Sequence, residues 1–291
     1  MNATPLRRST RLRVAALFVF ALLAAVGTSA GAGGGMRDRA YDVYALRYAT
    51  VRDFPVRYLV AGADTSRRTD IAMMFWLVKR PGRFLLVDAG FYRSKFLDDW
   101  KPADYVRPDE AVRRFGLDPK LITDIFVTHV HWDHLDGADL FPNARVWIQR
   151  AEYEHHVGDD GRPLDAAIDS LDAEMLASLR RAGRVELIDG DAREFLPGLT
   201  AYTGGKHTFA SQYLAVRTPK GKAVLASDNA YLYENLEHGV AIAQTLDARS
   251  NVAAIERMKT IAAFPRLIVP GHDPQVFERF KRRKPNVVSI E

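Results

Sequence analysis

The amino-acid sequence predicts a layered α/β domain over residues 41–291, and three observations support this fold class. The chain has 291 residues, 47% of them hydrophobic, which is enough to bury a full core. Predicted strands precede predicted helices in two successive halves of the chain. Neither a repeat nor an obvious linker follows residue 40. One layered domain accounts for this pattern.

Residues 1–32 have the order of a secretory signal peptide. Four arginines and no acidic residue occupy residues 1–13, residues 14–26 are uncharged and mostly apolar, and small residues follow as far as Gly35. The apolar run is shorter than the ~20 residues that span a bilayer. We therefore expect a cleaved segment over 1–32, a linker over 33–40, and an exported, periplasmic or secreted protein. An uncleaved membrane anchor is the alternative.

The net charge of +5 comes mainly from this segment, which carries four of the positive charges and leaves about +1 when removed. The basic cluster at residues 281–284 is expected at a solvated helix end, so the sequence predicts no nucleic-acid partner. The chain contains no Cys, which excludes disulfides, thiolate ligands and a cysteine nucleophile.

The individual elements are predicted from apolar runs, turns and caps. Residues 41–60 are expected to form a hairpin of two short strands around Asp53 and Pro55. Further strands are predicted at 71–78, 84–87, 125–128, 145–148, 185–188, 199–203, 212–217, 223–226 and 267–269. Helices are predicted at 109–115, after Asp118-Pro119, and at 164–181, 252–263 and 274–282.

The densest chemistry lies in residues 129–134, His-Val-His-Trp-Asp-His. Three histidines and an aspartate within six positions suit a divalent metal such as zinc, manganese or iron. Because an extended run precedes them, His129 and His131 can point the same way and share one ion. A loop or helical turn can direct Asp133 and His134 to a second ion, at the roughly 3.5–4 Å separation of two-metal hydrolases. A surface histidine cluster is the alternative.

Polar residues at other strand ends extend this motif. Asp88, Asp228 and His272 each follow a buried-looking strand, and His207 lies in a loop between two strands. Ligands of such sheets collect where strand ends open into loops, so we expect these side chains to meet at one edge of the sheet.

Three other features have simple structural explanations. His155 and His156, beside Glu152, are expected to be exposed on a surface helix. Lys206 is expected to point to solvent. Residues 73–76, Met-Met-Phe-Trp, fit either a core strand or a pocket wall.

In order and spacing, these residues resemble the metallo-β-lactamase superfamily over about residues 40–285. The resemblance implies an αββα sandwich. It also implies that His129, His131 and His207 hold one ion, that Asp133, His134 and His272 hold a second, and that Asp228 bridges them. Asp88-Ala89-Gly90 looks like the early Asp-x-Gly turn of that family, and we expect Asp88 to orient a ligand histidine rather than to bind metal.

Within the superfamily, a bridging Asp228 and the absence of Cys argue against the true β-lactamases. Asp228-Asn229-Ala230-Tyr231 looks like the N-acyl-homoserine lactonases, in which a tyrosine at this position reaches over the metals toward the substrate. One departure is that Phe209-Ala210 stands where the family usually has Pro-Gly after the third histidine. This leaves the loop shape and the substrate range open.

The expected function is the opening of lactone rings, above all of N-acyl-homoserine lactones. Two divalent ions, zinc in preference to manganese or iron, are expected to convert a shared water into the attacking hydroxide. Tyr231 is expected to meet the carbonyl oxygen, and Asp133 to carry the proton to the leaving alkoxide. The alternatives are a glyoxalase II-like thioesterase or another hydrolase of this fold, and a metal-binding protein without turnover. The oligomeric state is left open, and no membrane span is expected after processing.

Overall fold

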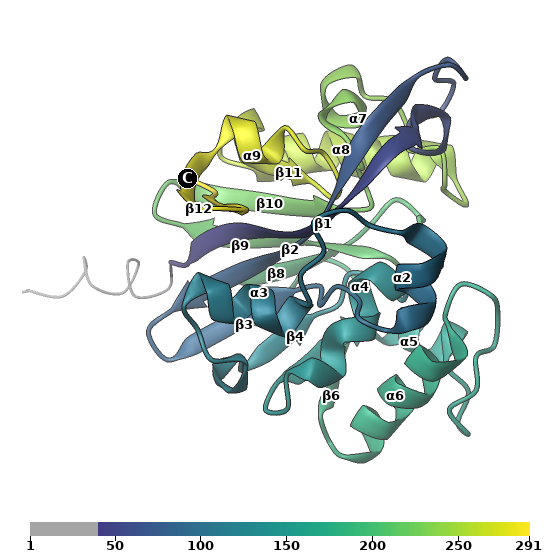
Figure 1. Ribbon diagram of the computed structural model, residues 1–291, viewed down its shortest axis with the longest axis vertical. Coiled ribbons are helices and arrows are strands. Elements are labelled where there is room, and N and C mark those ends of the chain that lie inside the picture. The colour runs from purple at the N-terminus through teal and green to yellow at the C-terminus, as the bar shows by residue number, and fades with distance from the viewer. Residues whose placement is uncertain (1–39) are drawn as a thin grey trace, which may run out of the picture.

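The computed structural model describes residues 40–291, so the predicted signal peptide and residues 33–39 of the predicted linker lie outside the described residues. Two β-sheets lie face to face between two groups of helices (Figure 1). The expected αββα sandwich is therefore confirmed. Within residues 40–291, none of the helices has the length and apolar character needed to cross a membrane.

Within the described residues, the larger sheet has eight strands in the order β12-β13-β1-β2-β3-β4-β5-β6. Their bounds are Asp42–Pro55 (β1), Arg68–Arg80 (β2), Arg83–Val87 (β3), Asp124–Phe126 (β4), Arg145–Gln149 (β5), Val185–Ile188 (β6), Lys281–Lys284 (β12) and Val287–Ser289 (β13). The smaller sheet has the order β11-β10-β9-β8-β7. Its strands are Arg193–Leu196 (β7), Leu199–Thr203 (β8), Gln212–Thr218 (β9), Gly221–Ser227 (β10) and Ile268–Pro270 (β11).

The helices lie on the two outer sides of the sheets (Figure 1). The first group comprises α2 (Ser94–Trp100), α3 (Pro108–Phe115), α4 (Trp132–Leu135), α5 (Arg150–His156) and α6 (Ser170–Arg181). The second group comprises α7 (Tyr233–His238), α8 (Ala248–Ile261) and α9 (Val276–Arg279). Aspartates cap several of these segments: the Asp169 side chain accepts from Leu171 N at the start of α6, and Asp247 accepts from Arg249 N at the start of α8.

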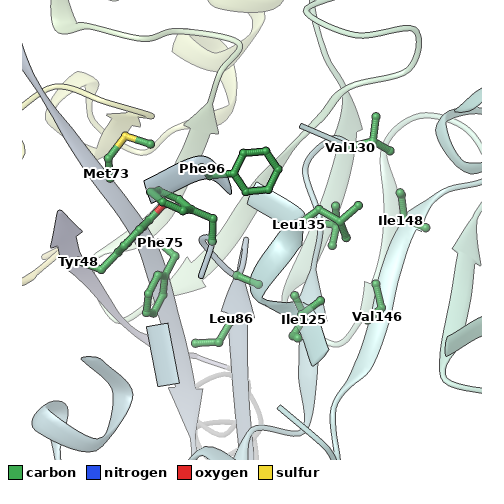
Figure 2. Close-up of a cluster of buried hydrophobic side chains, with 14 of the residues drawn as sticks. Tyr48, Met73, Phe75, Leu86, Phe96, Ile125, Val130, Leu135, Val146 and Ile148 are labelled. Carbon is green, nitrogen blue, oxygen red and sulfur yellow. The ribbon is translucent and has the colours of Figure 1, made fainter. Parts of the chain in front are cut away.

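Strand β2 lies in the middle of the larger sheet and is buried on both faces. Its odd-numbered residues from 71 to 77 belong to an apolar cluster with the first group of helices. Figure 2 shows Met73 and Phe75 of this cluster, with Phe75 near Leu86. Its even-numbered residues from 72 to 78 belong to a second cluster, with the smaller sheet and α8. Successive side chains of a strand point to opposite faces, so a strand buried on both faces requires a continuous apolar run.

The predicted hairpin within residues 41–60 is wrong. Residues 42–55 form one long strand, and its partners are β2 and β13 rather than a second strand before residue 60. Asp53 has a φ of 53°, and the pairing with β2 shifts register between Val51 and Phe54. Asp53 therefore lies in a bulge, where a short polar side chain tolerates positive φ, and the chain does not turn back there.

Several predicted helices begin or end elsewhere. The helix predicted at 252–263 is α8, which begins at Ala248, and the one predicted after Asp118-Pro119 is a single short turn, Pro119–Leu121. Helix α6 starts at Ser170 rather than at residue 164, because Asp169 caps it, and Leu164 is 60% exposed. The predicted helix at 274–282 is reduced to α9, and the basic residues 281–284 form the exposed edge strand β12. The basic cluster is therefore solvated as expected, but on a strand and not at a helix end. Strands β7 and β13 were not predicted.

The four strand ends predicted to carry functional residues belong to both sheets. Strands β3 and β4 are parallel neighbours in the larger sheet and lead to Asp88 and His129. Strands β10 and β11 are parallel neighbours in the smaller sheet and lead to Asp228 and His272. The side chains therefore meet where two sheets end together, not at the edge of one sheet.

Candidate metal centre

All seven predicted metal ligands come together in the structure. His129, His131 and His207, which we call the first cluster, form one group with Asp228 in which the donor atoms lie within 4.8 Å of one another. Asp133, His134 and His272, which we call the second cluster, form another such group.

The local backbone explains how adjacent residues serve different clusters. The chain leaves β4 in an extended conformation that continues to His131, whose φ and ψ are −64° and 148°. The short helix α4 then begins at Trp132 and turns Asp133 and His134 toward the second cluster. The expected change from extended chain to helical turn is what separates the two clusters.

Four of the histidines are held by their outer ring nitrogens. Nδ1 of His207 lies 2.8 Å from the Gln244 carbonyl oxygen, and Nδ1 of His272 lies 3.1 Å from that of Ala72. Nδ1 of His134 faces an Asp88 carboxylate oxygen at 2.8 Å. Nδ1 of His129 faces the Thr128 hydroxyl at 2.9 Å. Because each Nδ1–H has an acceptor, each Nε2 is left with a lone pair that points toward the centre.

The first cluster brings three ring nitrogens to metal-ligand spacing. Nδ1 of His131 lies 3.1 Å from Nε2 of His129 and 2.9 Å from Nε2 of His207. Two nitrogens bound at ~2.05 Å to one tetrahedral zinc ion are about 3.3 Å apart. Three inward lone pairs at this spacing repel one another unless a cation lies between them, so the geometry fits an ion.

Asp228 connects the two clusters. Its Oδ2 lies 3.4 Å from Nε2 of His207 and 3.8 Å from Nε2 of His129. Its Oδ1 lies 3.0 Å from Nε2 of His272 and 3.3 Å from Nε2 of His134. Each carboxylate oxygen faces a different cluster, which is the arrangement of a carboxylate that bridges two ions.

Two buried polar atoms at the second cluster have no hydrogen-bond partner within the described residues. Oδ2 of Asp133 lies 3.3 Å from Nε2 of His134 and 3.7 Å from Nε2 of His272. Among the described residues, His134 Nε2 and Asp228 Oδ1 are buried polar atoms that make no hydrogen bond. Buried polar atoms are rarely left unpaired, and these are both metal-ligand atoms. The residues therefore fit a pair of divalent ions.

The electrostatics of the two clusters differ. Burial, with the neighbouring histidines, lowers the pKa of His129 well below its usual value and that of His131 to about 4, which keeps both imidazoles neutral and able to bind metal. Burial also opposes protonation of His134, but the carboxylates of Asp228, Asp133 and Asp88 outweigh it and raise the pKa of His134 well above its usual value. The second cluster therefore attracts positive charge, which a cation supplies.

Asp88 accepts hydrogen bonds from several groups next to the second cluster. It is fully buried and has a φ of 63°. Its Oδ1 accepts from Thr128 N at 2.8 Å, and its Oδ2 accepts from the hydroxyls of Thr128 and Ser227 at 3.0 and 2.9 Å, as well as from His134. Asp88 is absent from both donor groups, in line with the prediction that it orients a histidine.

Tyr231 and a cavity of about 290 Å³ adjoin the clusters. The Tyr231 hydroxyl lies 3.4 Å from Nδ1 of His207, and its side chain is 4% exposed. The polar part of the cavity lining is His131, Asp133, Asp228, Tyr231, Gln244 and His272, and the rest is Phe54, Leu59, Ile71, Met73, Trp100, Trp132, Ala166 and Ala167. Of residues 73–76, Met73 alone contributes to this wall, while the other three lie in the core.

Comparison with known proteins decides the family. The sequence pattern of the metallo-beta-lactamase superfamily matches residues 74–272, which include every residue of both clusters. The chain belongs to the metallo-beta-lactamase superfamily.

Relatives within the superfamily are named as lactonases. The chain is 29% identical to an N-acyl homoserine lactonase of Bacillus sp over 83% of its own length and 90% of that protein. It is 27% identical to the N-acyl homoserine lactonase AttM of Rhizobium johnstonii over 73% of its length and 86% of that protein. The crystal structure of a quorum-quenching N-acyl homoserine lactone lactonase superposes with a TM-score of 0.69 at 21% identity, covering 86% of this chain and 98% of that one.

The loop after His207 has Phe209-Ala210 in place of the usual Pro-Gly, and the Phe209 ring contacts residues on both sides. Phe209 stacks on His155 with ring centroids 3.8 Å apart and an interplanar angle of 4°. Lys206 does not simply point to solvent: its Nζ donates to the Phe209 carbonyl at 2.7 Å and lies 4.7 Å from the centre of that ring. Contacts of Phe209 with His155 and Lys206 therefore take the place of the Pro-Gly turn in this loop.

Sequence reasoning missed three buried residues, Glu152, His156 and Asn229, that lie around this metallo-beta-lactamase site. His155 is exposed as expected, but His156 is 2% exposed and Glu152 is fully buried, so the surface interpretation of these two residues is wrong. Asn229 was also missed: its Oδ1 accepts from Gly205 N at 2.8 Å and so fixes the start of the His207 loop. The position of Asn229 directly after Asp228 was the signal available for it.

Proposed function

We propose that this protein is a dinuclear-metal hydrolase that opens lactone rings, with N-acyl homoserine lactones as its substrates. The observation that carries the proposal is one cavity whose lining combines Tyr231, Asp228 and members of both clusters with a set of apolar side chains. A lactone with an acyl chain has this same division into a polar reacting group and an apolar tail. The lactonase relatives that align with most of the chain support the same substrate class.

The proposed ligand assignment follows the two clusters. His129, His131 and His207 would hold one ion, the second cluster would hold the other, and Asp228 would contribute to both. We assign zinc because neutral imidazoles and carboxylates without thiolates suit it, although manganese and iron accept the same donors. A pair of such ions supplies a nucleophile at neutral pH and polarises the carbonyl group.

Tyr231 and Asp133 are the proposed catalytic residues. The Tyr231 hydroxyl is free to donate to the substrate carbonyl oxygen, because the nearby His207 Nδ1 already has the Gln244 carbonyl as its partner. Asp133 and Asp228 are the acidic side chains of the cavity lining. Both oxygens of Asp228 face the clusters, whereas Asp133 faces the second cluster through its Oδ2, so we assign the Oδ1 of Asp133 to carry the proton to the leaving alkoxide.

A substrate panel tests the reaction class. Purified, metal-loaded protein is given lactones of increasing acyl length, a glutathione thioester and a phosphodiester, and acid release is followed with a pH indicator. We expect turnover of the acyl homoserine lactones. Hydrolysis of the thioester or phosphodiester with no lactone opening would refute the proposal.

The Asp228→Asn variant tests whether turnover depends on the carboxylate that faces both clusters. An asparagine offers one oxygen in place of two, so it cannot bind an ion on each side. We expect lactone turnover to fall by at least 10²-fold while the fold is retained. A wild-type protein that binds metal yet opens none of the lactones would instead be a binding protein without turnover.

We also propose that the protein is exported, on the basis of the charge and hydropathy order of residues 1–32. The mass of the protein recovered from the cell envelope fraction and the medium tests this. Loss of about the first 32 residues is expected, and a full-length protein confined to the cytoplasm would refute it.

A further inference from the structure

A buried carboxylate outside both clusters connects the two segments that carry the first cluster. Glu152 lies in the first turn of α5, and its side chain is fully buried. A buried acidic group is costly unless it is paired, so its partners indicate what it does.

Glu152 accepts hydrogen bonds from three donors on two separate segments. Its Oε1 accepts from the backbone N–H of Val130 at 3.2 Å and from the hydroxyl of Thr208 at 2.5 Å. Its Oε2 accepts from the backbone N–H of Ala210 at 2.6 Å. Val130 lies between His129 and His131, while Thr208 directly follows His207. One carboxylate therefore ties the segment with two ring nitrogens of the first cluster to the loop with the third.

We infer that Glu152 is a positioning residue that sets the geometry of the first cluster, and that the affinity of this cluster for its ion depends on it. The inference rests on the proposed two-ion function. Within the described residues, the Glu152 side chain makes no hydrogen bond to a residue of the second cluster. The effect is therefore selective for one of the two ions.

The surroundings of Glu152 reinforce this role. Nε2 of His156, one turn later on α5, lies 3.6 Å from Oε2 of Glu152, and its Nδ1 lies 2.8 Å from a carboxylate oxygen of Asp165. On the same helix, His155 stacks on Phe209 of the His207 loop. Helix α5 thus holds this loop through a carboxylate and through a ring, which explains how the loop keeps its place without the Pro-Gly turn.

Glutamine at this position cannot reproduce the contacts. The three partners are all donors, and a carboxylate offers acceptors on both oxygens. A Glu152→Gln side chain has to turn its NH₂ either toward the Ala210 N–H or toward the Val130 N–H and the Thr208 hydroxyl. Either the Ala210 N–H or the Val130 N–H is then left without its acceptor, so the carboxylate's hold on one of the two segments is weakened.

The test measures metal binding rather than turnover. Wild type and Glu152→Gln are stripped of metal, and zinc affinities are determined by competition with a chromophoric chelator. Cobalt(II) absorption spectra are recorded in parallel, with His207→Ala and His272→Ala as references for loss of the first and second ion. Asp124→Asn is the matched control, because Asp124 is also a buried carboxylate with three donors but lies at the opposite end of β4 from His129.

We expect Glu152→Gln to weaken one ion by about 10- to 100-fold, with a cobalt spectrum that approaches that of His207→Ala, while Asp124→Asn retains both wild-type affinities. Equal weakening of both ions, or no weakening, would overturn the inference. If Glu152→Gln does not fold, Thr208→Val decides: it removes the 2.5 Å hydrogen bond and should selectively weaken the same ion.

The proposed function and this inference fail in different ways. Two bound ions with no lactone turnover would reject the proposed function and leave the role of Glu152 intact. Lactone turnover with unchanged affinities in both variants would reject the role of Glu152. A wild-type protein that binds fewer than two ions would overturn both.

Discussion

Removal of the Tyr231 hydroxyl should slow catalysis without loosening the fold or the metals. In the structure this hydroxyl makes one long contact, 3.4 Å to Nδ1 of His207, and that nitrogen already has the Gln244 carbonyl at 2.8 Å. Tyr231→Phe therefore leaves no buried donor without an acceptor, and the free energy of unfolding should change by less than about 1 kcal/mol.

The catalytic loss can be estimated from the proposed role of this hydroxyl. One preplaced donor to the developing oxyanion contributes about 10²- to 10³-fold in kcat, or about 2.7–4 kcal/mol. Because a bound metal ion would polarise the same carbonyl group, the lower end is expected, about 10²-fold. KM should change little, because the hydroxyl acts mainly on the transition state.

The assay is steady-state lactone hydrolysis with metal content and thermal midpoint measured on the same samples. Tyr213→Phe is the matched control, because Tyr213 is fully buried in the second apolar cluster and its hydroxyl makes no hydrogen bond within the described residues. We expect wild-type kcat for the control. A kcat for Tyr231→Phe within about threefold of wild type, or a loss of metal, would refute the reasoning.

Three further predictions concern metal affinity and the stability of the fold. Asp88→Asn must turn its NH₂ toward either the Thr128 N–H or the His134 Nδ1–H, so metal affinity should fall by about 10- to 100-fold; unchanged affinity in a chelator titration would contradict this. Burial, together with the charge of Asp136, raises the pKa of Asp172 to about 8 despite Arg93. The folded protein thus keeps a proton that the unfolded chain releases near its ordinary pKa of 3.8. This stabilising contribution is complete below about pH 4 and is lost as the pH rises to 8, with a slope of up to about 1.4 kcal/mol per pH unit. Asp172→Asn should flatten that part of the stability curve in denaturant titrations at pH 5–8, and an unchanged curve would argue against it. Removal of metal by a chelator should lower the thermal midpoint by about 10 °C, since saturating ligand at about 1,000 times its Kd contributes about 4 kcal/mol; calorimetry that finds equal midpoints would show that the ions do not stabilise the fold.

The sequence alone determined the chemistry of the centre and most of the strands. The order of His129, His131, Asp133 and His134 after an apolar run is a local pattern, and a local pattern is preserved whatever the rest of the chain does. The continuous apolar run of residues 71–78 likewise predicted a strand, and the structure buries it on both faces, because side chains alternate along any strand.

The tertiary structure decided how the pieces meet. The strand before His129 joins one sheet and the strand before Asp228 joins the other, and such long-range pairing leaves no local signal. The direction of each imidazole follows from carbonyls far away in sequence, such as that of Ala72 for His272. Glu152 and His156 looked like surface residues because their neighbours in sequence are polar, yet both are buried: the His207 loop bonds to Glu152, and Asp165 pairs with His156. Burial of a charged group depends on partners that only folding brings to it.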